Sequence, residues 1–122
     1  MPKLEFPELS LERQSEVLNT KPVEIVSFNG KITHTNSFDV NKKIYHIFDN
    51  NIYNIIMDLS KLEYINSTGV AMLIAIFYKV KENDGKIVIG GVHPFLENVF
   101  KLMDLPGRVT IYDTLEEAKK EF

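Results

Sequence analysis

Short apolar segments typical of strands alternate along this chain with segments of helical periodicity, and this alternation constrains the fold more than any other feature. The expected strands are rich in β-branched residues and cover 23–33, 53–60, 86–92 and 108–113. The expected helices cover 35–48, 68–82, 93–104 and 114–122. Such alternation predicts a mostly parallel sheet with right-handed helical crossovers. The expected fold class is therefore α/β, with four to five strands and about four helices in alternating β-α order.

The first twenty residues carry the weakest pattern. The stretch "LSLERQSEVL" (9–18) alternates apolar and polar residues only in part, so we expect at most an edge strand there. The chain has 122 residues, a length that suits one domain. We therefore expect a single domain over 1–122, with 1–20 as a poorly defined N-terminal segment.

Composition and charge exclude several classes of partner. The net charge of −3 is too weak to indicate binding to nucleic acid or to an anionic membrane surface. The chain has no cysteine, so it has neither disulfides nor thiolate metal ligands. Its N-terminus lacks the apolar stretch of a signal peptide, and the apolar run over 70–78 is too short to insert directly into a membrane. We expect a soluble protein in the cytoplasm.

Sequence motifs of catalysis and cofactor binding are absent. Gly85, Gly90 and Gly91 lack the spacing of a dinucleotide-binding loop, and there is no phosphate-binding P-loop. The two adjacent glycines instead suggest a tight exit from a strand. We therefore predict no cofactor.

The histidines do not form a catalytic or metal-binding pattern. His34, His46 and His93 are isolated, and no pair has the spacing of metal ligands. Ser67 also lacks the first glycine of a nucleophile elbow. We predict neither catalytic residues nor a metal site. A small enzyme or nucleotide binder that uses Asp58, Glu63 and Ser67 stays as a remote alternative, since Asp58 more simply closes a strand and caps the following loop.

Several helix starts carry capping residues. Asn36 and Ser37 are suited to begin the helix expected over 35–48. Thr114, with Glu117 three positions later, forms a capping box for the last helix.

The stretch "YINSTGVAMLIAIF" (64–77) places three polar residues directly before an apolar helix. Asn66, Ser67 and Thr68 all have side chains that cap helices well, so one of them could serve only that purpose. A hydroxyl at a helix N-terminus is also well placed for phosphorylation, because unpaired N–H groups and the helix dipole favour a phosphate there. The apolar run after it either contributes to an exposed partner-binding patch or is covered by a neighbouring helix.

An ordered set of motifs resembles the STAS domain, and in particular the bacterial anti-sigma factor antagonists. The resemblance covers residues 53–118 well and 23–52 loosely. A strand ending in D-L-S, an aromatic–apolar pair, and a short polar motif closed by glycine occur in the family's order. The matching residues are Asp58-Leu59-Ser60, Tyr64-Ile65, Asn66-Ser67-Thr68-Gly69, Gly85, Leu102 and Leu105.

The resemblance implies a phosphorylation switch rather than an enzyme. In the family, the serine of this motif is phosphorylated by an anti-sigma factor that is a serine kinase, and a phosphatase reverses the reaction. Carried onto this chain, the acceptor is Ser67, with Thr68 as the alternative. Asp58 and Gly69 are the structural residues of the motif. The residues expected to bind the partner are Tyr64, Ile65, Asn66, Ser67, Thr68, Gly69 and Met72.

The chain departs from the family pattern at Asn66, where the family usually has aspartate. Asparagine keeps the shape and the capping ability but removes the charge. The change eases repulsion of an incoming phosphate, but it impairs phosphorylation if the kinase uses the carboxylate. The alternative function is therefore a STAS scaffold or transport-complex subunit that is not phosphorylated.

Overall fold

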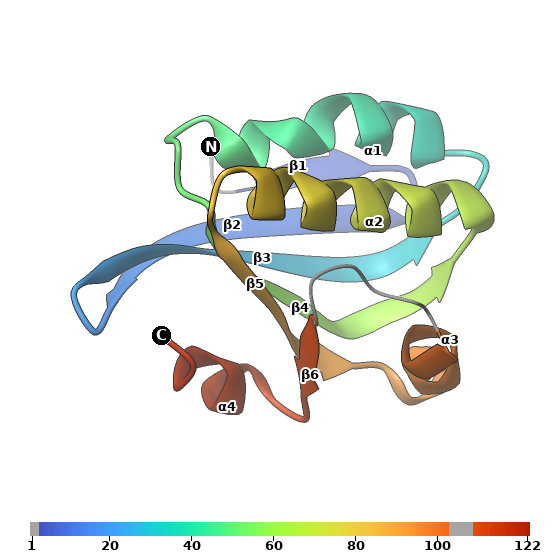
Figure 1. Ribbon diagram of the computed structural model, residues 1–122. Coiled ribbons are helices and arrows are strands. Elements are labelled where there is room, and N and C mark those ends of the chain that lie inside the picture. Colours follow the sequence, from blue (N-terminus) through green and yellow to red (C-terminus); the bar gives the residue numbers. More distant parts are fainter. Residues whose placement is uncertain (1–2, 103–108) are drawn as a thin grey trace.

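The computed structural model describes residues 3–102 and 109–122 and contains one six-stranded mixed sheet (Figure 1). The strands lie in the sheet in the order in which they occur along the chain. The second strand is antiparallel to the first and to the third, and the third to sixth strands are parallel. They are β1 (Lys3–Phe6), β2 (Leu9–Leu18), β3 (Lys21–Ile32), β4 (Asn54–Ile65), β5 (Lys86–Val92) and β6 (Thr110–Tyr112).

Helices cover both faces of this sheet. Figure 1 shows α1 and α2 side by side over one face, with α4 below the other. The helical elements are α1 (Ser37–Lys43), the 3-10 helix η1 (Ile44–Phe48), α2 (Ser67–Glu82), the 3-10 helix η2 (Pro94–Leu96), α3 (Glu97–Leu102) and α4 (Leu115–Lys119). The predicted α/β class and the mostly parallel sheet are confirmed.

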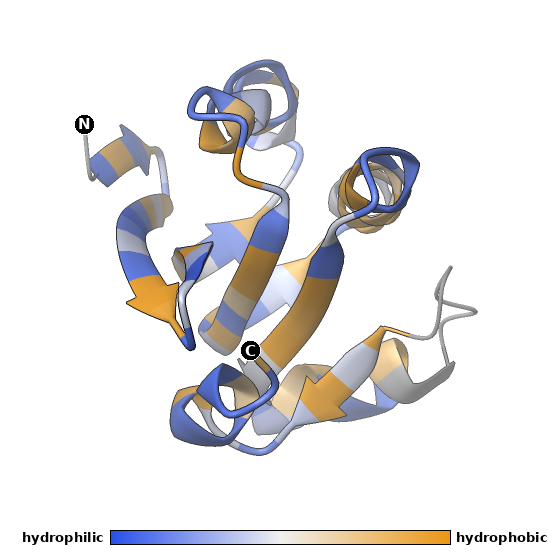
Figure 2. Ribbon diagram, turned by 60° about the vertical axis from the view of Figure 1, so that its left-hand side comes forward, coloured by the Kyte–Doolittle hydropathy of each residue, from blue (hydrophilic) through white to orange (hydrophobic). Residues whose placement is uncertain are grey.

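The core consists of two apolar clusters, one on each side of the sheet. Alternate residues of the strands point to opposite faces, so Met57 joins the larger cluster under α1 and α2 while Ile56 joins the smaller one under α4. Figure 2 shows hydrophobic residues concentrated along the middle of the strands. The α4 cluster is closed by Ala118 and Phe122, which are buried against Val88 and Val23.

The N-terminal segment departs most from expectation, because it forms two strands instead of one edge strand. Residues 9–18 form β2, which lies between β1 and β3, and β1 forms the edge. Leu9 and Leu11 are buried in the larger cluster. The sheet therefore has six strands where four to five were expected, because a hairpin needs only a few apolar side chains on one face to join a larger core.

Two expected helices are shorter and less regular than their apolar patterns indicated. The helix over 35–48 divides into α1 and η1, and the helix over 93–104 begins as η2 before α3. In the second helix, Leu96 and Phe100 are buried, but Phe95 is 83% exposed and Val99 is 41% exposed. The 3-10 turn changes the periodicity, so these two side chains leave the buried face. Met103, also expected on that face, lies outside the described residues.

The expected caps behave differently from one another. Thr114 accepts a hydrogen bond from the backbone N–H of Glu117 at 3.1 Å, as the capping box requires. Asn36 precedes α1, but its side chain does not cap that helix. It is fully buried and donates instead to the carbonyl oxygens of Pro7 and Lys31, while its Oδ1 accepts from the Thr33 N–H. Asn36 therefore ties the β1–β2 turn to the end of β3.

Candidate functional site

The candidate site lies where β4 ends and α2 begins, at the carboxyl edge of the parallel strands. Asn66 has an extended backbone, and its Oδ1 accepts a hydrogen bond from the N–H of Gly69 at 2.8 Å. Asn66 is therefore the N-cap, and Ser67 is the first residue of α2. Of the three polar side chains that could have capped the helix, the asparagine does so.

Ser67 and Thr68 lie on the surface of the protein. Both residues are exposed in the first turn of α2. Since Asn66 supplies the capping oxygen, neither hydroxyl is needed to satisfy that N–H group. The first turn of α2 thus presents two accessible hydroxyl groups next to backbone N–H groups at the positive end of the helix dipole.

Gly69 permits close contact between the first turn of α2 and the ends of two strands. A Cβ atom at this position would lie 2.6 Å from Cγ1 of Ile65 and 2.9 Å from Cγ2 of Ile32. The backbone N–H of Asn66 also donates to the carbonyl oxygen of Ile32 at 3.0 Å. The absence of a side chain at Gly69 therefore lets the first turn of α2 lie close to the ends of β3 and β4.

Three of the residues expected to bind a partner are buried in the structure. Ile65 is 8% exposed, Met72 is 3% exposed, and Gly69 is buried. Their surfaces contact the core that holds α2 on the sheet. Tyr64 is 50% exposed, and Asn66, Ser67 and Thr68 are also accessible. The accessible part of the expected surface therefore comprises Tyr64 and residues 66–68.

The apolar face of α2 is mostly covered. Met72, Leu73, Ile76, Phe77 and Val80 are buried in the larger cluster together with residues of α1. A narrow strip of Ala71, Ala75 and Tyr78 remains exposed. The larger part of the run is thus core, and the exposed strip adds little apolar surface.

Asp58 does not close β4, in contrast to expectation. The strand continues to Ile65, and Asp58 lies half-buried at an irregularity in its pairing with β3 and β5. Its Oδ1 accepts hydrogen bonds from the N–H and the hydroxyl of Ser60, at 3.1 and 2.6 Å. A bulge lets the strand continue while this carboxylate caps two donors locally.

The position of Asp58 also argues against a joint acid–base site with Ser67. Eight residues lie between the two, most of them in extended strand, which corresponds to on the order of 20 Å. The Cβ of Ser60 lies 3.1 Å from the position a Cβ of Gly91 would take, and Gly91 has a φ of +94°. β5 continues to Val92, so Gly90 and Gly91 lie inside the strand and do not form the tight strand exit that was expected; Gly91 instead takes a left-handed conformation beside the Asp58 bulge.

The sequence reading missed Phe38, which is 72% exposed at the start of α1. It follows Ser37, whose Oγ lies 3.5 Å from Nδ2 of Asn66, so the first turn of α1 adjoins the candidate site. Phe95, in η2 just after β5, is also at the carboxyl edge of the parallel strands. Phe38 does not fall on the apolar stripe of its own helix. An aromatic residue outside that stripe was the feature of the sequence that could have indicated its exposure.

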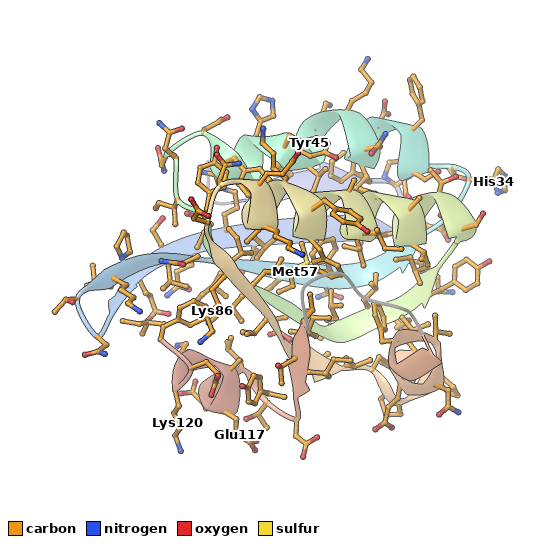
Figure 3. The ribbon with its side chains drawn as sticks, in the orientation of Figure 1. His34, Tyr45, Met57, Lys86, Glu117 and Lys120 are labelled. Carbon is orange, nitrogen blue, oxygen red and sulfur yellow. The ribbon has the colours of Figure 1, made fainter. Side chains whose placement is uncertain are left out.

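The histidines remain apart in the structure. Figure 3 shows His34 projecting outward near the end of β3. His46 Nδ1 lies 3.0 Å from Asp49 Oδ2, and His93 Nδ1 accepts from the Phe95 N–H at 3.2 Å. Within residues 3–102 and 109–122, no group of three or more histidine or acidic side chains is arranged to hold a metal ion.

The fold and the site together define a small α/β module that presents an accessible serine at a strand–helix junction. The family model for the STAS domain matches residues 14–118. The chain therefore belongs to the STAS domain family. No helix within the described residues is long and apolar enough to cross a membrane.

The chain is similar to proteins that are named as anti-sigma factor antagonists or candidates for that role. A Thermotoga maritima protein, named as a candidate anti-sigma factor antagonist, is 29% identical over 100 residues, which span 81% of this chain and 88% of the relative. A crystal structure of a Thermotoga maritima protein with the same designation has a TM-score of 0.74 at 23% identity, covering 89% of this chain and 92% of that one. The Bacillus cell fate determinant SpoIIAA in its phosphorylated form has a TM-score of 0.64 at 23% identity, with 89% and 97% covered. The two structural likenesses show that the chain has the SpoIIAA-like fold.

Proposed function

We propose that this protein is an anti-sigma factor antagonist in the bacterial cytoplasm. In its unphosphorylated form it binds an anti-sigma factor serine kinase, and phosphorylation of Ser67 releases that kinase. A phosphatase acting on phospho-Ser67 restores binding, so the cycle regulates sigma-factor-dependent transcription. The protein itself catalyses no reaction in this scheme.

The observation that carries the proposal is that Asn66 caps α2 while Ser67 is exposed. Because the asparagine caps α2, the serine hydroxyl is exposed and can be modified without loss of the cap. The name of the Thermotoga maritima relative and the existence of a phosphorylated form of SpoIIAA support the same role. Thr68, exposed in the same turn, is the alternative acceptor.

The position of Ser67 explains how a phosphate would control binding. A phosphoryl group adds about −1.5 to −2 charges and lies at the positive end of the α2 dipole, so the free protein tolerates it well. In an interface without a cationic partner, the same charge loses its hydration at a cost of several kcal/mol. Changing a bound-to-free ratio from 99:1 to 1:99 requires only about 5.5 kcal/mol. Charge and bulk at one residue are thus sufficient, without a large conformational change.

The surface around Ser67 is suited to a protein partner. Tyr64 in β4 and Phe38 in α1 are large, exposed aromatic residues; Tyr64 lies two positions before Asn66, and Phe38 follows Ser37, whose hydroxyl lies 3.5 Å from the Asn66 side chain. Aromatic side chains are enriched among the residues that dominate binding at protein interfaces. We therefore include Phe38 with Tyr64 and residues 66–68 in the proposed interface.

The proposal is tested with the cognate kinase, ATP and purified protein, followed by phosphopeptide mapping and a binding assay. Ser67→Ala should prevent phosphorylation but retain binding, and Ser67→Asp should weaken binding by tenfold or more. Thr68→Ala is the matched control, and it should be phosphorylated like the wild type. Equal loss of binding in Ser67→Ala and Ser67→Asp would contradict a switch at this residue.

Asn66 favours a second candidate, a STAS scaffold or transport-complex subunit that is not phosphorylated. If the kinase requires a carboxylate before the acceptor serine, the asparagine removes it. Mapping that finds no phosphate on Ser67 or Thr68, in the presence of a partner that still binds the Tyr64 surface, would favour the scaffold. Recovery of phosphorylation in Asn66→Asp would then assign the loss to this single residue.

A further inference from the structure

A cavity of about 220 Å³ lies at the end of the molecule opposite Ser67. It is bounded by the last turns of α2, the start of β5, β6 and the chain after α4. Lys81, on its rim, is 14 residues from Ser67 in α2, about 21 Å along the helix axis. The cavity therefore shares no residue with the proposed kinase interface.

The floor of the cavity consists of apolar side chains. Phe77 and Val80 of α2 are each 1% exposed, and Ile87 of β5 is 8% exposed. Val109, just before β6, completes this floor. Pairing of β5 with β6 starts only at Val88, so β6 does not cover the first two residues of β5. The cavity is thus a notch at the sheet edge with a floor of core side chains.

Lys86 and Glu121 are in contact at the mouth of the cavity. The ammonium group of Lys86 donates to the carbonyl oxygen of Glu121 at 2.8 Å, but lies 3.6 Å from its carboxylate. That distance exceeds the roughly 2.7–2.9 Å of a strong charge-assisted hydrogen bond. Figure 3 shows Lys86 among the side chains above α4. The ammonium group also lies 5.3 Å from the centre of the Phe122 ring, and the Lys86 side chain is 47% exposed, so the lysine is accessible at the mouth of the cavity.

Lys81 adds a second cation to the rim and is exposed. The Glu121 carboxylate has a further neighbour in Tyr112, and partial burial together with this carboxylate raises the pKa of the tyrosine. The tyrosine hydroxyl therefore stays protonated beside Glu121. The charged side chains that line the cavity are two lysines and one glutamate, so the lysines exceed the carboxylates by one, which favours a ligand with a single negative charge.

We propose that this cavity binds a compact organic monoanion, a carboxylate on a single aromatic ring or a similar apolar body. The body contacts Phe77, Val80 and Ile87, while the carboxylate lies between Lys81 and Lys86. The cavity is smaller than the roughly 300–1,000 Å³ of drug-sized sites, which restricts the ligand to one ring. A few polar groups at the rim of an apolar pocket are the usual arrangement of small-molecule sites.

The test is a titration of the ¹⁵N-labelled full chain with phenylacetate, followed by amide NMR shifts. Shifts should be saturable and centred on Lys81, Gly85 and Ile87, up to roughly 20 mM ligand, enough to fill a site with a Kd of about 1 mM. The neutral isostere 2-phenylacetamide should bind several-fold more weakly. Absence of saturable shifts at these residues, or equal binding of the amide, would overturn the proposal.

A matched pair of lysine variants separates the site from general charge effects. Lys81→Met should raise the Kd by about fivefold, because it removes one partly exposed charge at the rim. Lys79→Met removes an exposed lysine of the same helix that does not line the cavity, and it should leave the Kd unchanged. Equal effects of the two substitutions would refute the assigned role of Lys81. None of these measurements depends on phosphorylation of Ser67.

Discussion

The side-chain oxygen of Asn66 accepts a hydrogen bond from the backbone N–H of Gly69 at 2.8 Å, and this bond defines the start of α2. It assigns the cap to the residue at which this chain departs from the family pattern. Aspartate could accept the same bond, so the departure changes charge at the site and leaves the local geometry available. Substitutions at position 66 can therefore distinguish the effect of the helix cap on stability from the effect of the charge on phosphorylation.

We predict that Asn66→Ala lowers the free energy of unfolding by about 1 kcal/mol, through loss of the cap. Asn66→Asp should retain or slightly increase it, because a negative charge at a helix N-terminus gains about 0.3–1 kcal/mol. Urea unfolding followed by circular dichroism measures both changes. A loss in Asn66→Asp as large as in Asn66→Ala would show that the amide group, and not the accepting oxygen, stabilises the junction.

The ion pair of Arg13 and Glu24 should be a strong determinant of stability. Glu24 is 1% exposed, with its Oε1 3.3 Å from Nε of Arg13 and its Oε2 2.8 Å from the Ser15 hydroxyl. Arg13 also donates to the carbonyl oxygen of His46. Arg13→Met leaves a buried carboxylate without its cation and should lower the free energy of unfolding by about 3–5 kcal/mol.

A double substitution tests whether the loss of stability comes from leaving the Glu24 carboxylate unpaired. Arg13→Met combined with Glu24→Leu removes both charges and should recover most of the stability lost in the single variant. Chemical denaturation of the two single variants and the double variant gives the coupling energy. If the effects of the two single substitutions simply add, the pair is not coupled as the geometry indicates.

The turn between β2 and β3 contains a strained threonine. Asn19 and Thr20 have φ values of +49° and +70°. Positive φ at both central residues is the pattern of a type I′ turn, in which Asn-Gly is preferred. Thr20→Gly should therefore stabilise the protein by about 0.5–1 kcal/mol, because a β-branched residue is unfavourable there.

Thermal unfolding of Thr20→Gly measures this gain. Thr35→Gly changes an exposed threonine that has no positive φ, and it is the matched control. The control should not be stabilised, since glycine there only adds freedom to the unfolded chain. Equal effects at the two positions would rule out relief of strain at Thr20.

We predict that the ionisation of Tyr112 lowers the stability of the folded protein at high pH. Partial burial raises the pKa of Tyr112 above its ordinary value of 10.0, and the hydrogen bond to Glu121 and the negative charge of Glu121 raise it further. The folded protein therefore favours the protonated form. The protonated Tyr112 hydroxyl contributes its full stabilisation to the folded protein below the unfolded pKa of about 10. This stabilisation is lost as the pH rises through the pKa of the folded protein.

Unfolding of the wild type and of Tyr112→Phe is measured at several pH values from neutral to strongly alkaline. The difference between the two proteins isolates the contribution of Tyr112 from that of the lysines, which titrate in the same range. The wild type should lose more stability than the variant above about pH 10. Parallel pH profiles for the two proteins would contradict the assigned shift.

The central elements could be predicted because their patterns are local. The long apolar run after Gly69 has the length and composition of a helix, and α2 extends over Ser67–Glu82. The segment "KIVIGGV" became β5 with the expected bounds. The residues of the N-terminal hairpin and of η2 were harder to assign, because weak alternation and a single 3-10 turn leave little periodic signal.

The sequence by itself determined the α/β order, the strand–helix junction at residues 64–69 and the presence there of three side chains able to cap a helix. Only the tertiary structure decided which of them caps α2 and which are exposed, because this depends on the backbone angles at the end of β4. It also decided that Ile65, Gly69 and Met72 face the core while Phe38 adjoins Asn66. Burial is set by segments distant along the chain, such as Ile32 against Gly69, and local periodicity carries no information about them.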